Sequence, residues 1–363
     1  MTGLSLRPAA ECRYDAVALG EVMLRFDPGA ARIRTARSFD VWEGGGEYNV
    51  ARGLARTFGK RTAVLSALVD NEIGHLVEGL ILAGGVDTSW IRWCDFDGAG
   101  RAVRNALNFT ERGFGIRGAV GVSDRGNSAS SQLRPGDFDD QALLARAGAR
   151  WLHTGGIFAG LSDDSAACAQ HLMDAARAHG TVVSVDLNYR PSLFADDPDG
   201  GRARQVFDGL ASRTDVLIGG FQDFEERLGV PGSDGGASDR ERLEHYAGEL
   251  FARYPSLRIV ASTIRDVSSA SIHTWSAHAV ERAGSYVAAQ RFTDLAILDR
   301  VGGGDGFVAG FVAQLLDGGS LQSAVDVGTA HGALAMTTPG DNSMASLQDV
   351  LGLVHAQGAT ERR

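Results

Sequence analysis

Short apolar segments of strand length alternate with helical patterns along most of the chain. The apolar segments lie at residues 15–19, 62–68, 150–153, 181–185, 215–218 and 257–262. Alternation of this kind is typical of βαβ units, in which buried parallel strands are covered by helices on both faces. The pattern therefore predicts an α/β protein built around a mostly parallel sheet.

Two amphipathic helices are predicted from apolar residues that recur every three or four positions. In the first helix, Val50, Leu54 and Phe58 fall on one face, and Gly59 stands where a C-terminal cap belongs. The second helix covers residues 307–316 and follows a glycine run. Both helices are expected in the core.

Two segments, 21–42 and about 91–133, interrupt the βαβ rhythm. The second alternates apolar and polar residues but is broken by Gly113, Gly115 and Gly118. Such segments predict extra strands joined by turns, in a small sheet that projects from the main domain as a lid.

The expected division of the chain follows from these patterns. It assigns residues 1–14 to a loose N-terminal tail, 15–20, 44–90 and 134–355 to the α/β core, 21–43 and 91–133 to the β lid, and 356–363 to a C-terminal tail.

The composition narrows the classes of partner. With 35 basic and 45 acidic residues the formal charge is −10, and no basic stripe is present, so nucleic acid is not an expected partner. The three cysteines lie far apart, which argues against a disulfide framework and fits a reducing cytoplasm. The longest apolar stretches are too short to cross a bilayer, and the N-terminus lacks the apolar region of a signal peptide. We expect a cytoplasmic protein that acts on small molecules.

Several common nucleotide-binding and catalytic motifs are absent. Asn49 occupies the place of the third glycine in a dinucleotide fingerprint that would begin at Gly44, and Gly59-Lys60 lacks the Ser or Thr of a P-loop. No nucleophile elbow, zinc-protease helix or EF-hand loop occurs in the sequence. A Rossmann dehydrogenase, a P-loop NTPase and an α/β-hydrolase are therefore not expected.

The strongest candidate for chemistry is the segment 299–307, Asp-Arg-Val-Gly-Gly-Gly-Asp-Gly-Phe, which opens the second predicted helix. Three glycines at a helix start leave backbone N–H groups free to face an anion, and the helix dipole adds partial positive charge there. Asp305 could accept a proton from a hydroxyl group held beside that anion pocket. The alternative is that Asp305 only caps the helix.

Two further segments carry candidate ligand contacts. Residues 44–51, Gly-Gly-Gly-Glu-Tyr-Asn-Val-Ala, permit close backbone approach to a polyol, and Asn49 offers a donor and an acceptor to hydroxyl groups. The alternative for this segment is a helix start after a flexible turn. Asp186, Asn188 and Arg190 follow a predicted buried strand, where the carboxyl edge of a sheet forms a ligand crevice.

Two other arginines are candidate anion contacts. Arg125 and Arg265 could each bind a carboxylate or phosphate, although a single arginine is more often only solvated. The histidines show no metal-ligand spacing, and His331 and His153 suit a packed core or cleft position.

Together, the two glycine-rich segments resemble the ribokinase-like (PfkB) carbohydrate kinase family. Residues 44–51 match its N-terminal sugar-binding signature, and residues 299–310 match its C-terminal D-x-x-G-x-G-D signature. The stretches 186–191 and 332–341 are most similar to the 2-keto-3-deoxygluconate kinases of that family. The resemblance covers nearly the whole chain.

The resemblance implies a three-layer α/β/α core with a small β-sheet lid, ATP and Mg²⁺ as cofactors, a monovalent cation as a further option, and a homodimer. It implies that Asp305 is the catalytic base and that Gly302, Gly303 and Gly304 form the anion hole. Implied contacts with the sugar or sugar acid are Glu21, Gly45, Gly46, Asn49, Arg125, Asp186, Asn188 and Arg190. Implied contacts with ATP are Thr263, Arg265, Gly304, His331 and Asn342.

One departure from the family pattern concerns the metal. The family usually has N-x-x-E after the strand predicted at 215–218, whereas this chain has Gly220 and Asp223 at those places. Asp223 is one methylene shorter and lacks its amide neighbour, so we expect it to hold hydrated Mg²⁺ less well.

The expected function is an ATP-dependent sugar kinase that acts on 2-keto-3-deoxygluconate. The alternatives are a ribokinase-type kinase of another sugar, and a sugar- or nucleotide-binding protein in which catalysis is weakened.

Overall fold

The computed structural model describes residues 2–233 and 235–355. Its main sheet is built from β1 (Ala16–Leu19), β4 (Thr62–Val69), β5 (Ile91–Cys94), β8 (Trp151–Gly155), β9 (Val182–Asp186), β10 (Val216–Ile218), β11 (Ile259–Ser269), β12 (Ile272–Glu281), β13 (Tyr286–Ala288) and β14 (Phe292–Ala296). The order is β13-β12-β11-β10-β9-β8-β1-β4-β5, with β14 paired to β12. Pairing is parallel from β5 to β11 and antiparallel beyond it. All six predicted strand segments lie in this sheet, so the α/β prediction is confirmed.

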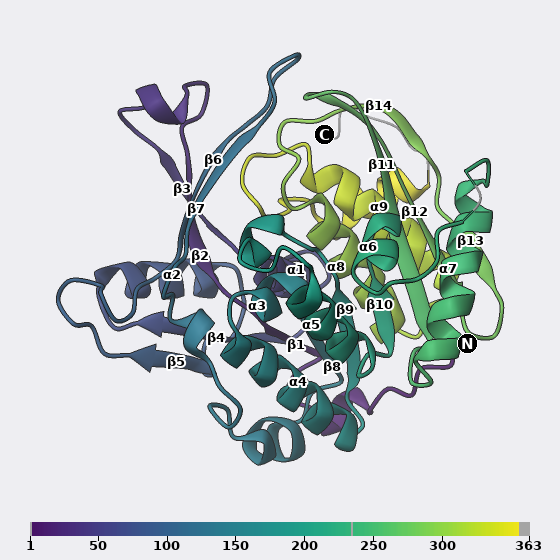
Figure 1. The fold of residues 1–363 in the computed structure, drawn as a ribbon, viewed down its shortest axis with the longest axis horizontal. Coiled ribbons are helices and arrows are strands. Elements are labelled where there is room, and N and C mark those ends of the chain that lie inside the picture. Colours follow the sequence, from purple (N-terminus) through teal and green to yellow (C-terminus); the bar gives the residue numbers. More distant parts are fainter. Residues whose placement is uncertain (1, 234, 356–363) are drawn as a thin grey trace.

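Helices cover both faces of the main sheet (Figure 1). They are α1 (Gly46–Arg56), α2 (Glu72–Ala83), α3 (Gly156–Gly160), α4 (Asp163–Ala178), α5 (Gly201–Ala211), α6 (Phe221–Glu226), α7 (Asp239–Arg253), α8 (Gly303–Leu316), α9 (Leu321–Ala335) and α10 (Leu347–Val354). Shorter helical turns are η1 (Ala9–Glu11), η2 (Ile33–Thr35), η3 (Ser130–Gln132), η4 (Gln141–Ala147) and η5 (Pro191–Phe194). Both predicted helices are present, as α1 and α8, but α8 is buried on all sides rather than amphipathic, since residues 306–313 are all buried.

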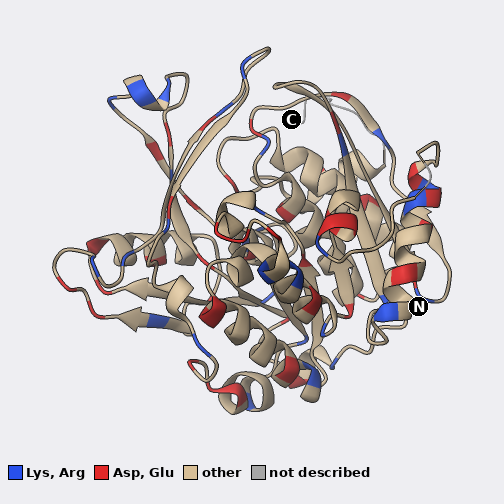
Figure 2. Ribbon diagram, viewed as in Figure 1, with Lys and Arg blue, Asp and Glu red and all other residues tan. Residues whose placement is uncertain are grey.

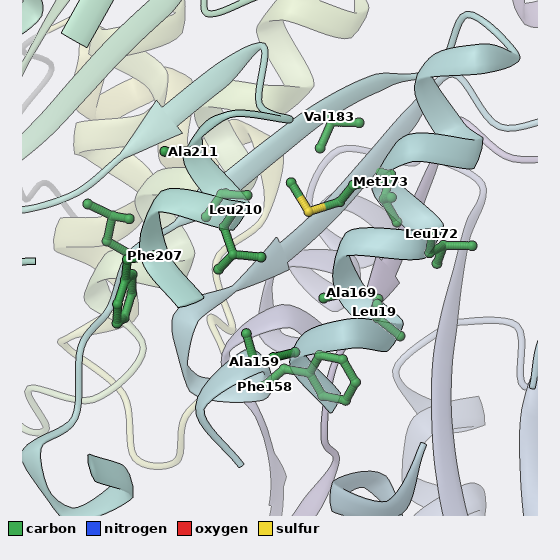
Figure 3. Packing of buried hydrophobic residues seen from close by; sticks show 14 of the residues in the cluster. Leu19, Phe158, Ala159, Ala169, Leu172, Met173, Val183, Phe207, Leu210 and Ala211 are labelled. Atoms are coloured by element: carbon green, nitrogen blue, oxygen red, sulfur yellow. The ribbon is translucent and has the colours of Figure 1, made fainter. Parts of the chain in front are cut away.

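The core divides between the two faces because alternate strand residues point in opposite directions. Leu19 of β1 belongs to one buried cluster with Phe158 of α3, Leu172 of α4 and Phe207 of α5 (Figure 3). Val17 belongs to the same cluster. On the other face, Ala16 packs with residues of α1, α8 and α9. Burying a large apolar side chain contributes about 1.5–3 kcal/mol, so these two layers fix the helices against the sheet.

A second sheet of four strands projects from the main sheet (Figure 1). It contains β2 (Met23–Asp27), β3 (Asp40–Gly44), β6 (Leu107–Glu111) and β7 (Val120–Asp124), in the order β3-β2-β6-β7. We call it the lid sheet. The turn between β6 and β7 reaches the turn between β11 and β12, where Ala270 N–H donates to the carbonyl of Gly115 at 2.9 Å. The lid sheet therefore bridges one end of the main sheet.

Parts of the predicted division are wrong. Ile91–Cys94 forms β5 and pairs with β4 in the main sheet, so it does not belong to the lid. The segment before residue 15 is packed rather than loose, since Cys12 and Tyr14 are buried and Arg7 donates to the carbonyl of Leu144 at 2.7 Å. The predicted tail 356–363 lies outside the described residues. Within the described part of the chain, no helix is both long and apolar enough to span a membrane.

Candidate active site

The two glycine-rich segments meet where α1 and α8 begin. The side-chain amide of Asn49, in the first turn of α1, donates to Oδ2 of Asp305 in the first turn of α8, at 2.7 Å. The helices pack closely enough that a Cβ on Gly53 would lie 2.8 Å from Cβ of Ala309. Residues 256 positions apart in the sequence thus form one site, as the motifs predicted.

The start of α8 is shaped to receive an anion. Gly302 has a left-handed backbone (φ +82°), and a Cβ there would overlap the carbonyl oxygen of Asp341, so only glycine fits. At Gly304, by contrast, the space beside the backbone is open. The first N–H groups of α8 have no acceptor within the helix, and they present partial positive charge to this space.

Asp305 does not act as the helix cap. Gly302 occupies the N-cap position, and no side chain caps α8. The alternative that Asp305 only caps the helix is therefore wrong. Burial raises the pKa of Asp305 to about 6, although the hydrogen bond from Asn49 stabilises the charged form. This carboxylate is largely ionised at neutral pH.

Other carboxylates converge on Asp305. Burial, followed by the charges of Asp305 and Asp223, raises the pKa of Asp186 to about 8. Burial raises the pKa of Glu47 to about 7; a backbone hydrogen bond opposes this shift, and the charge of Asp305 adds to it. Arg190 lowers the pKa values of both Asp186 and Asp305. Arg190 is therefore a nearby cation that partly balances this acidic cluster.

Two of the predicted sugar contacts, Gly46 and Asn188, lie beside Asp305. A Cβ on Gly46 would lie 3.5 Å from Oδ1 of Asp305 and 3.7 Å from the side-chain nitrogen of Asn188. Asn188 itself has a left-handed backbone, with φ +34°. At Gly45, a Cβ would overlap the carbonyl oxygen of Glu21. The structure therefore brings Gly46, Asn188 and Asp305 together.

Glu21 and Arg125 are paired with each other. An Nη atom of Arg125 lies 3.0 Å from Oε2 of Glu21, and the other carboxylate oxygen, Oε1, accepts a hydrogen bond from the hydroxyl of Ser128. Burial raises the pKa of Glu21, and Arg125 opposes that shift. The Nε atom of Arg125 is buried and has no partner, so this arginine keeps one donor for another group.

The predicted ATP contacts separate into two groups. Thr263 and Arg265 lie on β11, and Arg265 is exposed. The prediction that His331 contacts ATP is wrong. This side chain is fully buried between α8 and α9, and its Nδ1 lies 2.7 Å from the carbonyl oxygen of Gly306. Asn342 is also buried, and its amide nitrogen donates to the backbone carbonyl of Glu43 at 2.9 Å, but its Oδ1 has no hydrogen-bond partner, so its contact with ATP stays a prediction.

The predicted metal residue Asp223 lies beside the acidic cluster. Its Oδ2 accepts a hydrogen bond from the backbone N–H of Gly220 at 3.1 Å, and burial raises its pKa. The described residues contain no group of three or more side chains that could hold a metal by themselves. Mg²⁺ commonly binds one or two carboxylates together with phosphate oxygens and water. The mutually repelling Asp186 and Asp223 fit such a shared site.

Arg25 is a functional candidate that the sequence did not reveal. It lies on β2, is completely buried, and is hydrogen-bonded to both Asp299 and Asp341. Asp27 lies 3.6 Å from the same guanidinium group. Because Asp341 also packs against Gly302, Arg25 connects the lid sheet to the anion pocket. The partners are 274 and 316 positions away, so no local pattern marked this residue.

Glu47 was also missed, although it belongs to the glycine-rich segment 44–51. It is buried where β1 and β8 end, since a Cβ on Gly155 would lie 2.9 Å from its Oε1. The sequence did offer a signal for Glu47, because it is a charged residue within the segment 44–51 that we predicted to bind a ligand.

Comparisons with known proteins find a family model and similar proteins along nearly the whole chain. The profile described as "pfkB family carbohydrate kinase" matches residues 14–348. The chain is 29% identical to a 2-dehydro-3-deoxygalactonokinase from Haloferax volcanii over 92% of this chain and 94% of that protein. It is 27% identical to a 2-dehydro-3-deoxygluconokinase from Bacillus subtilis over 91% of each. The crystal structure of 2-dehydro-3-deoxygluconokinase from Thermotoga maritima has a TM-score of 0.84 and 32% identity, over 94% of this chain and 99% of that one.

We predict that Arg25→Met lowers the free energy of unfolding by about 3–5 kcal/mol, because it leaves buried carboxylates without their cation. Urea-induced unfolding measures the change. The control is Arg13→Met, which breaks the more exposed Arg13–Asp87 pair (2.7 Å) and is expected to cost about 1 kcal/mol or less. Equal losses in the two variants would contradict the structural importance of Arg25.

Proposed function

The chain belongs to the pfkB family of carbohydrate kinases, and on that premise we propose that it transfers the γ-phosphoryl group of ATP to a hydroxyl group of 2-keto-3-deoxygluconate or a closely similar keto-deoxy sugar acid. The observation that carries this proposal is the position of Asp305. Its carboxylate lies at the start of α8, hydrogen-bonded to Asn49 and beside an open backbone anion pocket.

Asp305 is the proposed proton acceptor. Asn49 binds Oδ2, while Oδ1 faces the space next to Gly46 and Asn188. A substrate hydroxyl in that space would donate its proton to Oδ1 as its oxygen attacks the γ-phosphorus. With a pKa of about 6, Asp305 is a stronger base than an ordinary aspartate and is still ionised at pH 7.

The anion pocket is the proposed site of the transferring phosphoryl group. Phosphoryl transfer depends mainly on positioning and on charge stabilisation, and the N–H groups of residues 302–304 supply fixed donors at the helix N-terminus. Asp186 and Asp223 are the residues proposed to hold Mg²⁺. When bound, Mg²⁺ neutralises charge on the phosphates.

The acidic substrate is supported by the names of the similar kinases and by the arginines beside the site. Arg190 has no carboxylate bound to it among the described residues, and it lies near Asp186 and Asp305. We propose that Arg190 binds the substrate carboxylate, with the free Nε of Arg125 as a second donor. The alternative of a neutral sugar is favoured by the pairing of Arg125 with Glu21, because a paired arginine has less need of a substrate carboxylate.

We propose a cytoplasmic location. The three cysteines are all free thiols, which supports a reducing compartment.

The structure gives no support for a monovalent cation between Asp299 and Asp341. These buried carboxylates lie next to the anion pocket, and both are hydrogen-bonded to Arg25.

We also propose a homodimer that forms through the lid sheet. Val41, Phe26, Phe109 and Val122 are paired in register across its four strands and share the face opposite Arg25. Val41 and Val122 are 40% and 49% exposed, although they stand in an apolar row. An exposed apolar face of this kind is suited to contact with a second copy.

A substrate panel tests the proposed activity. ADP release is measured with ATP and Mg²⁺ against 2-keto-3-deoxygluconate, gluconate, ribose, fructose and adenosine. We expect turnover on the keto-deoxy acid, and Asp305→Asn should lower kcat by about 100-fold or more while ATP binding is retained. Unchanged turnover in this variant would show that Asp305 is not the catalytic base. ATP binding without turnover on any sugar would favour the binding-only alternative.

The pH dependence of kcat tests the ionisation of Asp305. The base must be unprotonated, so kcat should fall as the pH drops through about 6, and by about tenfold for each unit below it. Asn49→Ala removes a hydrogen bond that favours the charged form and should therefore move this acid limb to higher pH. An acid limb at the same pH in both proteins would contradict the proposed geometry.

The dimer proposal is tested by light scattering. Val122→Glu places a charge on the apolar row and is expected to give a monomer. The control is Leu82→Glu on α2, where the leucine is 55% exposed and lies outside the lid sheet. A dimer that survives Val122→Glu would place the interface elsewhere.

A further inference from the structure

The buried guanidinium group of Arg25 reaches the anion pocket through two separate carboxylates. One Nη atom donates to Oδ2 of Asp299, and the other donates to Oδ1 of Asp341. Asp299 lies three residues before Gly302 in the loop that leads into α8, and Asp341 lies in the loop that follows α9. One rigid, planar group therefore holds both of the loops that meet at Gly302.

Each of these two residues also contacts the backbone of the pocket. Oδ1 of Asp299, the oxygen that does not bind Arg25, accepts a hydrogen bond from the backbone N–H of Val301 at 3.1 Å. The carbonyl oxygen of Asp341 lies against Gly302, where it leaves no room for a Cβ. Residues 301 and 302 are thus held from both sides, directly before the first N–H donors of α8.

The cluster around Arg25 does not supply net positive charge to the pocket. The carboxylate of Asp27 lies 3.6 Å from Arg25 and 3.1 Å from Nε of Arg112. Together with Asp299 and Asp341, three buried carboxylates therefore face two guanidinium groups. The positive charge of Arg25 is balanced where it stands, so any effect of Arg25 on the reaction comes from position rather than from charge.

The pocket needs such a restraint because it is made of glycines. Residues 302–304 are three consecutive glycines, and glycine restricts its own backbone less than any other residue. Their N–H groups therefore depend on neighbouring groups for a fixed direction. Donors stabilise a transition state best when their direction is set before the reaction, and a misplacement of about 1 Å can lower the rate about 100-fold.

We propose that Arg25 is a positioning residue for phosphoryl transfer, which acts through Asp299 and Asp341 to hold the backbone donors of the anion pocket. This proposal rests on the proposed kinase function. Arg25 lies on β2 and is completely buried, so it has this effect without touching the substrates. Because β2 belongs to the lid sheet, the donors keep their working direction only while the lid sheet lies in its present position.

The test uses Arg25→Lys, because lysine keeps the positive charge but cannot bind two carboxylates in a fixed fork. Below the melting temperature of the variant, kcat for the keto-deoxy acid should fall by about 10- to 100-fold, while KM for the sugar changes by less than about threefold. The charge of Asp341 raises the pKa of Asp305, and the variant keeps the cation beside Asp341. The acid limb of kcat should therefore stay at the pH of the wild type.

Asp299→Asn is a second variant, and it decides the test if Arg25→Lys does not fold. It should also lower kcat, because it weakens the bond to Arg25 while an oxygen remains for the N–H of Val301. The double variant should lose little more turnover than the worse single variant, because both changes break one connection. The control is Arg117→Lys, which alters a pair with Glu111 (2.7 Å) inside the lid and should leave kcat unchanged.

Unchanged kcat in folded Arg25→Lys, or in Asp299→Asn where the lysine variant does not fold, would overturn the proposal. A fall in kcat with a displaced acid limb would also overturn it, because Arg25 would then act through the charge of Asp305. If the wild type phosphorylates no sugar, only the kinase assignment fails, and calorimetry tests the pocket. ATP should then bind more tightly than ADP, and Arg25→Lys should reduce that difference by about tenfold. An unchanged difference would count against the positioning role.

Discussion

The buried guanidinium group of Arg25 is the interaction on which the arrangement of this site depends. It joins three segments: β2 of the lid sheet, the loop before α8 that contains Asp299, and the loop after α9 that contains Asp341. Burying these charges costs several kcal/mol for each ion unless they stay paired. Because the carbonyl oxygen of Asp341 also packs on Gly302, the pairing fixes the anion pocket and the lid sheet in one relative position.

Carboxylates gather beside Asp305, and Arg190 is the cation that lowers the pKa values of Asp186 and Asp305. Charged residues of both signs are spread along the rest of the chain (Figure 2). Asp305 stands at the start of α8, next to the open backbone at Gly304. A sugar hydroxyl and a phosphate can therefore meet at the start of α8, where a proton acceptor lies next to an anion site.

The sequence was sufficient for features that depend on local pattern. Apolar runs located the strands, three-to-four spacing located α1 and α8, and the glycine motifs correctly placed Asn49 near Asp305. Features set by distant contacts were missed. The edge strand β5 has only four residues and no clear alternation, and the partners of Arg25 lie hundreds of positions away. The sequence allowed a packed core or a cleft position for His331 but could not choose between them, because a helical histidine looks the same in sequence whether it faces a cleft or a neighbouring helix.

Hydrogen-bond partners within the protein distinguish structural polar residues from candidate ligand contacts. A buried polar group needs a partner, and one supplied by the fold leaves less reason to invoke a ligand. His331 has such a partner and so gives no reason to invoke a ligand, whereas Oδ1 of the buried Asn342 has none. Oδ1 of Asp305 has no such partner in the part of the chain that the structure describes. It faces the space beside Gly46 and Asn188, which is where the proposed reaction needs the substrate hydroxyl.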